Sequence, residues 1–333
     1  MKILYAIQGT GNGHLSRAVD VAPALEKHGE VDYFVSGVQS DIDFPYDLAF
    51  RSKGLSFYFG KRGGINYSKT FFRNSALRLY HEIKDFPIEN YDLVVNDFEP
   101  ISAWAAKVKS KKCVALSHQS ALLTGQFPRP DKKDPVGRAI LKNYAPADRH
   151  YGFHFQSRVD NNVYTPIIRK AVREAINENL GHFTVYLPAY SDEKIIKVLS
   201  QIDEVEWQVF SKHTQTAYKP GNIKIQPVNN DLFIKSITTS AGVLCGAGFE
   251  TPSEALFLGK KLLVIPMKDQ YEQQCNAAAL RSMGIPVLQK LEMKSTNTLR
   301  ELVSSPDPKP LEYPDETEVI VNRLVEREVE NGQ

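Results

Sequence analysis

The chain has 333 residues, and its 41 lysines and arginines nearly balance its 39 aspartates and glutamates, for a net charge of +2. The length is sufficient for two domains with separate cores, and the charge balance argues against binding of nucleic acid through bulk positive charge. Three widely spaced cysteines, Cys113, Cys245 and Cys275, form no metal-binding pattern and fit a reducing compartment. No apolar run approaches the roughly 20 residues of a membrane span, and the run at 1–7 is too short for a signal peptide, so we expect a cytoplasmic protein.

The first half of the chain alternates short apolar runs with segments of helical spacing. Strands are expected at 3–7, 31–35, 92–95 and 113–116, with one more within 46–58. Helices are expected from His14 to about Lys27, at 68–85 and from Pro100 to about Ser110. Turns or loops are expected at 60–64 and 131–136. This alternation predicts a parallel, doubly wound sheet.

The second half begins a similar series after a polar, proline-bearing segment at 163–180, which we interpret as the connection between two domains. Strands are expected at 183–187, 206–210, 223–225, 243–245 and 262–266. Helices are expected at 192–200, from Asp231, from Thr251, from Asp269 and at 315–330. We therefore predict two Rossmann-like domains, 1–165 and 166–314, that face each other across a cleft. The segment 315–333 is expected to hold a terminal helix that packs back toward the first domain.

Residues 240–280 contain two successive strand–turn–helix units. After the first strand and its glycines, Thr251, Pro252 and Glu254 have the spacing of an N-cap, a first helical residue and a capping-box glutamate. Asp269 begins a similar pattern after the second strand. Both helices would start at one edge of a parallel sheet, where free N–H groups and helix dipoles favour an anion. The sequence therefore predicts a phosphate site at this edge.

A glycine-rich loop, Gly9–His14, follows the first strand. A dinucleotide-binding motif would need its third glycine where His14 stands, and an acid at the end of the next strand, where Val35-Ser36 stand instead. A redox domain is therefore not expected. His14 could be a general base, since an imidazole titrates near neutrality, or a locally hydrogen-bonded histidine at a helix start. Spacing alone favours neither interpretation.

Other polar residues at strand ends also have two interpretations. Glu99 fits the N-cap of the helix at Pro100, whereas Asp97 fits that role less well and could orient His14. His118 could act directly, but a hydrogen-bonded histidine that lines the cleft is favoured. Glu254 could bind back to Thr251 or accept ribose hydroxyls.

Several of these stretches resemble the GT-B glycosyltransferases. The likeness lies in Gly246–Leu256, Gly259, Pro266 and Asp269–Asn276, which are similar to the donor-nucleotide motif of that group. It is greatest to the family 28 domain of the peptidoglycan N-acetylglucosaminyltransferase, with the UDP-glycosyltransferases next. Gly9–His14 resembles their N-terminal loop, Val94–Asp97 the strand end with the dyad aspartate, and Ser117–Gln119 their acceptor loop.

The resemblance implies a GT-B fold with an acceptor-side first domain and a donor-binding second domain. It implies that His14 removes the proton of the acceptor with help from Asp97, and that Glu254 binds the ribose. It places the donor diphosphate at Gly246, Ala247, Gly248, Phe249 and Thr251, the base at Val228, and the donor sugar at Gln273 and Gln274. It places Gly11, Asn12, Gly13 and His118 on the acceptor side. It implies neither a metal nor a cofactor.

We therefore expect an inverting, metal-independent glycosyltransferase (a hexosyltransferase). It would move a sugar from a nucleotide sugar, UDP-linked in our hypothesis, to a glycan, a lipid-linked acceptor of the cell envelope or a small molecule. A nucleotide-sugar hydrolase or 2-epimerase, and a non-catalytic nucleotide-sugar-binding regulator, are the alternatives. Peripheral contact with the inner face of the membrane is a further hypothesis, based on Lys69, Phe71, Phe72, Arg73, Leu77 and Arg78.

Overall fold

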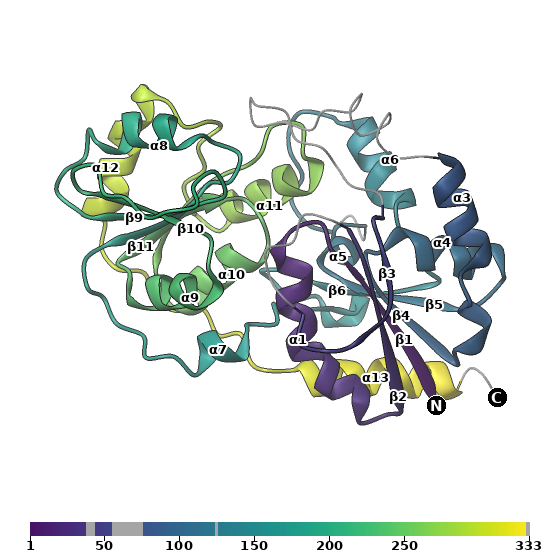
Figure 1. The fold of residues 1–333 in the computed structure, drawn as a ribbon. Coiled ribbons are helices and arrows are strands. Elements are labelled where there is room, and N and C mark those ends of the chain that lie inside the picture. Colours follow the sequence, from purple (N-terminus) through teal and green to yellow (C-terminus); the bar gives the residue numbers. More distant parts are fainter. Residues whose placement is uncertain (38–43, 55–75, 124–125, 331–333) are drawn as a thin grey trace.

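The computed structural model describes residues 1–37, 44–54, 76–123 and 126–330, which form two lobes (Figure 1). In these residues each lobe contains a parallel sheet with helices on both faces. The strand order is β3-β2-β1-β4-β5-β6-β7 in the first lobe and β10-β9-β8-β11-β12 in the second. The prediction of two doubly wound α/β domains is confirmed.

The first lobe is built from the following elements. Its strands are β1 (Lys2–Gln8), β2 (Glu30–Ser36), β3 (Leu48–Ser52), β4 (Leu93–Asp97), β5 (Cys113–Ser117), β6 (Arg149–Phe153) and β7 (Val163–Tyr164). Its helices are α1 (Asn12–Glu26), α3 (Ala76–Asp85), α4 (Pro100–Val108), α5 (His118–Leu123) and α6 (Pro135–Asn143), with short 3-10 turns at Ile88–Asn90 and Val159–Asn161.

The second lobe follows a short helix, α7 (Lys170–Arg173), in the connection. Its strands are β8 (Phe183–Tyr186), β9 (Trp207–Ser211), β10 (Ile223–Pro227), β11 (Gly242–Gly246) and β12 (Lys261–Ile265). Its helices are α8 (Asp192–Leu199), α9 (Asn230–Thr239), α10 (Glu250–Phe257), α11 (Tyr271–Ser282) and α12 (Thr296–Ser304), with a 3-10 turn at Met293–Ser295. The chain then returns to the first lobe as α13 (Thr317–Glu330).

Some predicted elements differ from the observed ones. The helix expected at 68–85 is seen as α3 from Ala76 onward, and its earlier part, like the turn at 60–64, lies outside the described residues. The expected loop at 131–136 is wrong at its end, because Asp134 caps α6 by accepting a 2.8 Å bond from the N–H of Gly137. The interpretation of Glu99 as an N-cap is confirmed, since its carboxylate accepts from the N–H groups of Ile101 and Ser102.

Alternate residues of the inner strands pack on opposite faces of each sheet, as expected where helices cover both faces. In the second lobe Leu244 and Leu263 pack with α8 and α12, while Val243 and Val264 pack with α9 and α10. The cluster that contains Val243 continues without a break into the first lobe, where it includes Ile3 of β1. One apolar core therefore joins the two lobes.

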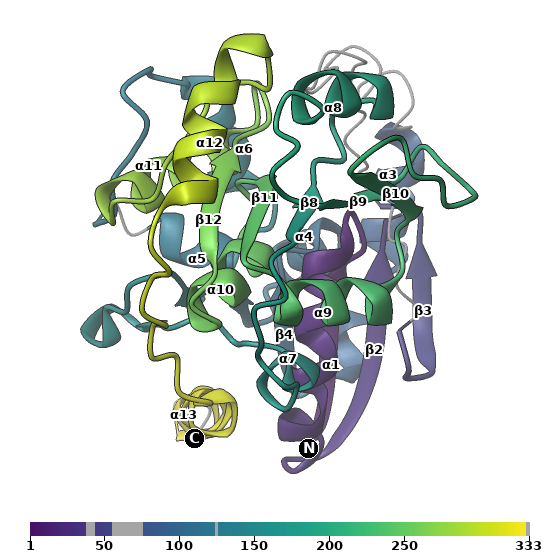
Figure 2. The same ribbon diagram turned by 90° about the vertical axis from the view of Figure 1, so that its left-hand side faces the viewer.

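Helix α13 lies against α1, at the end of the first lobe where the chain begins (Figures 1 and 2). Leu324 of α13 is fully buried in the shared core, whereas Val319 of the same helix is 53% exposed. The last segment of the chain thus contributes to the core of the first lobe.

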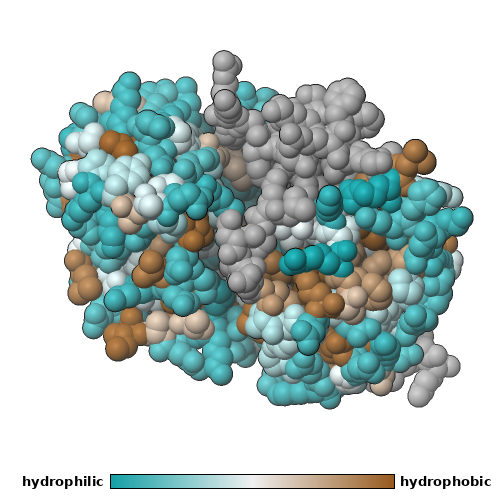
Figure 3. All heavy atoms as spheres, viewed as in Figure 1, coloured by the Kyte–Doolittle hydropathy of each residue, from teal (hydrophilic) through white to brown (hydrophobic). Residues whose placement is uncertain are grey.

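No helix within the described ranges has the length and apolar character needed to cross a bilayer. Of the residues considered for membrane docking, 69, 71, 72 and 73 lie outside the described residues. Leu77 is 72% exposed, and Arg78 donates to Glu82 one turn further along α3. On the face in Figure 3, exposed hydrophobic residues are scattered among hydrophilic ones.

We predict that Leu324→Ala lowers the free energy of unfolding by about 2–5 kcal/mol, because it opens a cavity in the core that α13 and the first lobe share. Val319→Ala is the matched control on the exposed side of the same helix and should change this free energy by about 0.5 kcal/mol or less. Urea unfolding followed by circular dichroism measures both. Equal effects of the two substitutions would contradict the packing of α13.

Candidate functional site

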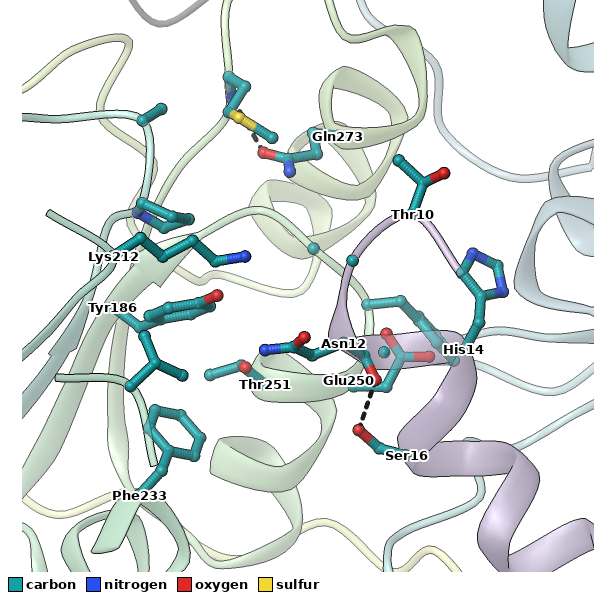
Figure 4. Close-up of a pocket in the computed structure, with 18 of the residues that line it drawn as sticks. Thr10, Asn12, His14, Ser16, Tyr186, Lys212, Phe233, Glu250, Thr251 and Gln273 are labelled. Atoms are coloured by element: carbon teal, nitrogen blue, oxygen red, sulfur yellow. Dashed lines mark hydrogen bonds between the residues drawn. The ribbon is translucent and has the colours of Figure 1, made fainter. Parts of the chain in front are cut away.

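A cavity of about 600 Å³ lies between the lobes. The first lobe contributes the loop Thr10–His14 and Ser16, and the second contributes residues that follow β8, β9, β10, β11 and β12. Ligands of parallel α/β sheets bind at this edge, beyond the carboxyl ends of the strands. In Figure 4, Thr10 and His14 lie on one side of the cavity, and Tyr186, Lys212 and Phe233 lie on the other.

His14 and Asp97 form a hydrogen-bonded pair. The Nδ1 atom of His14 lies 2.8 Å from Oδ1 of Asp97, whose side chain is fully buried, while the imidazole is 15% exposed and lines the cavity. Because a carboxylate can only accept, Nδ1 carries the proton and Nε2 is left as the basic nitrogen. Burial lowers the pKa of His14, but the neighbouring Asp97 carboxylate outweighs this, so that the pKa is raised above its ordinary value.

The backbone between Asp97 and Glu99 explains why their carboxylates contact different helices. β4 ends at Asp97, and Phe98 then has a φ of 57°, a left-handed conformation that non-glycine residues seldom adopt. After this turn Glu99 caps α4, while Asp97 faces α1. Neighbouring carboxylates thus serve two different helices.

Arg17 lies one helical turn after His14 and contacts the same carboxylate. Its Nη2 is 2.7 Å from both oxygens of Asp97, and its Nη1 donates to Glu250 of the second lobe. Burial raises the pKa of Asp97, but Arg17 and His14 outweigh burial and lower it, so the carboxylate is charged. The sequence analysis missed Arg17, although its spacing of three from His14 puts both on one helix face.

The start of α10 differs from the prediction. We expected Thr251 to be the N-cap, but the helix begins at Glu250 and its N-cap is Phe249, whose side chain has no hydrogen-bonding group. Pro252, which has no N–H, therefore occupies the third helical position. Thr251 and Phe249 line the cavity, and a Cβ on Gly248 would meet open space. The first turn of α10 thus presents its N–H groups to the cavity without a side-chain cap.

The neighbouring helix α11 starts beside α10, because β11 and β12 are paired in parallel. Its N-cap is Gln270 rather than the expected Asp269, and the Gln270 side chain accepts a 2.5 Å bond from the N–H of Gln273. This helix start therefore already has a partner for one of its N–H groups. Of the two helix starts at the predicted phosphate site, the start of α10 is the more open.

Not all of the predicted donor residues face the cavity. Val228, Gly248, Phe249, Thr251 and Gln273 line it, as do Gly11, Asn12 and Gly13 from the first lobe. Gly246 and Ala247 lie behind this wall, and the carbonyl of Ala247 accepts from Asn276. The amide of Gln274 turns away to donate to the carbonyl of Met267.

Glu254 also differs from the expectation. It is 2% exposed and does not bind back to Thr251, since both of its oxygens accept from the guanidinium of Arg169, in the connection between the lobes. Arg169 itself lines the cavity and donates to Asn230 of α9 through Nη1. Any contact between Glu254 and a ligand would therefore involve Arg169, which the sequence analysis missed.

His118 does not line the cavity, in contrast to our expectation. It is 1% exposed, its Nδ1 lies 2.7 Å from the carbonyl of Phe153, and its Nε2 lies 2.6 Å from Oδ1 of Asn276 in the other lobe. Its ring stacks on Phe249 with centroids 3.9 Å apart. Burial lowers the pKa of this histidine. Its place in the structure is a contact between the lobes, against Phe249 and Asn276.

Further polar residues of the cavity had not been assigned a role from the sequence. Glu272 lines the cavity and accepts a 3.0 Å bond from Gln119, whose amide nitrogen also lies 3.4 Å from Nε2 of His14. Lys212, after β9, lines the opposite wall with Tyr186. Among the described residues, no group of three or more His, Cys, Asp or Glu is placed to hold a metal ion.

Solved structures that are similar to this chain include glycosyltransferases. A glycotransferase of kitacinnamycin matches with a TM-score of 0.58 and 14% identity, covering 99% of this chain and 95% of that one. UGT89C1 of Arabidopsis thaliana, complexed with UDP, matches with a TM-score of 0.58 and 12% identity over 98% and 94%. MurG of Acinetobacter baumannii matches with a TM-score of 0.53 and 15% identity over 97% and 94%. The fold is therefore GT-B, as predicted.

No curated protein sequence matches the chain. The model of glycosyl transferase family 1 matches residues 1–305, which include both sheets and the whole cavity. The expectation of a glycosyltransferase is confirmed, and this chain belongs to glycosyl transferase family 1.

Proposed function

We propose that this glycosyltransferase is inverting and metal-independent, and that it moves a sugar from a UDP-linked donor to an acceptor hydroxyl. The proposal rests above all on one observation. His14, whose Nε2 is the basic nitrogen, lines a cavity that also receives the uncapped first turn of α10. A base and an anion site thus share one space of about 600 Å³, within the range of small-ligand pockets.

In the proposed reaction Nε2 of His14 takes the proton of the acceptor hydroxyl while its oxygen attacks the anomeric carbon. The bond from that carbon to the donor diphosphate breaks on the opposite face, which inverts the configuration. Asp97 stabilises the imidazolium that forms, and the N–H groups of α10 stabilise the charge on the departing diphosphate. General base assistance is worth about 10²–10⁴-fold, and each well-placed donor to a developing anion about 3 kcal/mol.

The choice of UDP draws on several features. The likeness to family 28 and to the UDP-glycosyltransferases favours it, and UGT89C1 was crystallised with UDP. In the cavity, Val228 and Phe233 offer a half-buried surface for a base, and Arg169, which lines the same cavity, could contact the ribose. A hexose donor and a glycan or lipid-linked acceptor at the cytoplasmic face of the membrane complete the proposal.

The function is tested by incubation with a panel of UDP-hexoses and UDP-N-acetylhexosamines, with and without a library of hydroxyl acceptors. Products are identified by NMR, which reports the anomeric configuration. A product of inverted configuration, formed without added metal in the presence of EDTA, is expected. Free sugar or a 2-epimer without acceptor would indicate a hydrolase or an epimerase instead. Binding of UDP without turnover of any combination of donor and acceptor would indicate a non-catalytic regulator.

We predict that His14→Ala lowers turnover by about 10²–10⁴-fold, because the acceptor loses its base. The donor site lies on the other lobe, so the stabilisation by UDP in a thermal-shift assay should remain, at roughly 2.7 kcal/mol when UDP is at 100 times its Kd. His28→Ala, just beyond the end of α1, removes a surface histidine that contacts Asn322 and is the control. Wild-type turnover in His14→Ala would exclude His14 from the reaction.

The pH dependence follows from the raised pKa of His14. A base must be neutral to act, and a raised pKa keeps it protonated to a higher pH. We therefore expect kcat/KM to fall on acidification with a midpoint above the ordinary imidazole pKa of ~6.5. Asp97→Asn removes the negative charge that raises the pKa, so its midpoint should lie lower and its maximum rate should be reduced. A midpoint unchanged by Asp97→Asn would show that another group controls the fall of kcat/KM on acidification.

A further inference from the structure

Arg17 contacts acidic groups of both lobes at once. Its guanidinium holds both oxygens of Asp97 at 2.7 Å in the first lobe and donates to Oε1 of Glu250 in the second. The side chain is 2% exposed, Asp97 is fully buried, and Glu250 is 24% exposed at the cavity wall. A planar guanidinium can serve two carboxylates in this way, which an ammonium cannot do with the same geometry.

Glu250 is a charge that a phosphate site must neutralise. It is the first residue of α10, at the helix end proposed to receive the donor diphosphate, where an unpaired carboxylate would repel a second anion. Figure 4 shows it on the side of the cavity where Asn12, His14 and Ser16 lie, away from Lys212. The approach is close, because a Cβ on Gly13 would lie 2.4 Å from Oε2 of Glu250. The carboxylate of Glu250 therefore occupies the space that a side chain at position 13 would need.

The geometry points to Arg17 as a positioning residue of the reaction, which fixes Asp97 behind His14, neutralises Glu250 at the phosphate site, and does both only when the two lobes are together. This inference rests on the proposed function of His14 and of α10. Opening the lobes would separate Arg17 from Glu250 and leave that carboxylate unpaired beside the donor site. The same contact that prepares the base thus also prepares the anion site.

Other contacts also join the lobes. Gln119, which lies beside Nε2 of His14, bonds to Glu272, and His118 bonds to Asn276. His14 is thereby surrounded by groups from three elements, namely Asp97 of β4, Arg17 of its own helix and Glu250 of α10. The positive charge of Arg17 opposes protonation of His14, and the negative charges of Asp97 and Glu250 favour it.

The test uses the full chain with Arg17→Met, Glu250→Gln, the double variant, and Arg17→Lys. Arg149→Met is the control, because it removes an arginine that is 38% exposed and paired with Glu328 at the opposite end of the first sheet from the cavity. Three readouts apply to each variant: the NMR titration of the His14 ring, calorimetric binding of UDP, and kcat against KM for the donor found active in the panel. The first two readouts require no turnover.

Arg17→Met should raise the pKa of His14, weaken UDP binding by about tenfold or more because Glu250 is unpaired, and lower kcat by about 10²-fold because Asp97 is misplaced. The double variant should restore UDP binding to within about threefold of wild type and leave kcat low. Arg17→Lys should recover part of kcat at most. Arg149→Met should match the wild type in all readouts.

Two results would overturn the inference. They are an Arg17→Met variant with normal UDP binding and normal kcat, and a double variant in which UDP binding stays as weak as in Arg17→Met. If Arg17→Met does not fold, Glu250→Gln alone decides, because it should tighten UDP binding and lower the pKa of His14, whereas a purely structural contact would change neither. Wild-type turnover in His14→Ala, combined with the expected effects on UDP and on the titration, would refute the base while leaving the role of Arg17 at the anion site intact.

Discussion

The site depends on one constraint, which is that the carboxylate of Asp97 is fully buried and must be paired. A buried charge without partners would cost several kcal/mol, so the fold has to deliver cations to the end of β4. Helix α1 delivers two groups from one face, the imidazole of His14 and the guanidinium of Arg17, spaced by three residues. The loop Gly9–Gly13 determines where α1 begins, and therefore the positions of the His14 and Arg17 side chains.

The second lobe completes this arrangement from the other side of the cavity. Its α10 follows β11 with an N-cap whose side chain cannot bond to the helix N–H groups, and its first residue, Glu250, contacts Arg17. The N-terminal end of α10 is thus open to an anion, and Arg17 neutralises the negative charge of its first residue, Glu250. Arg169 acts similarly at Glu254, one turn further along α10. Glu250 and Glu254, on one face of α10, are thus each paired with an arginine from outside the second sheet. We propose that the cavity beside this helix accepts the diphosphate.

Much of the fold could be read from the sequence, because hydrophobic runs of four or five residues between glycine turns and helical segments leave few alternatives to a parallel sheet. The site was harder. The N-cap at Glu99 was recognisable from Pro100, but the same rule placed the start of α10 at Thr251, since proline is also tolerated at the third helical position, where no N–H is needed. The partners of Glu254, His118 and Glu250 lie in the other lobe or in the connection. Contacts at such sequence separations leave no local signal, so Arg169 could not be predicted, and for Arg17 only its helix spacing from His14 pointed to the site.

The account requires the donor diphosphate to lie at the first turn of α10, facing His14. A crystal structure of the protein with UDP bound tests this most directly. We expect the β-phosphate within hydrogen-bonding distance of the N–H groups in Gly248–Thr251, with Glu250 still bound to Arg17 and Nε2 of His14 facing the space beyond the phosphate. A diphosphate bound elsewhere, or an α10 start that is occluded or displaced when UDP is present, would contradict it.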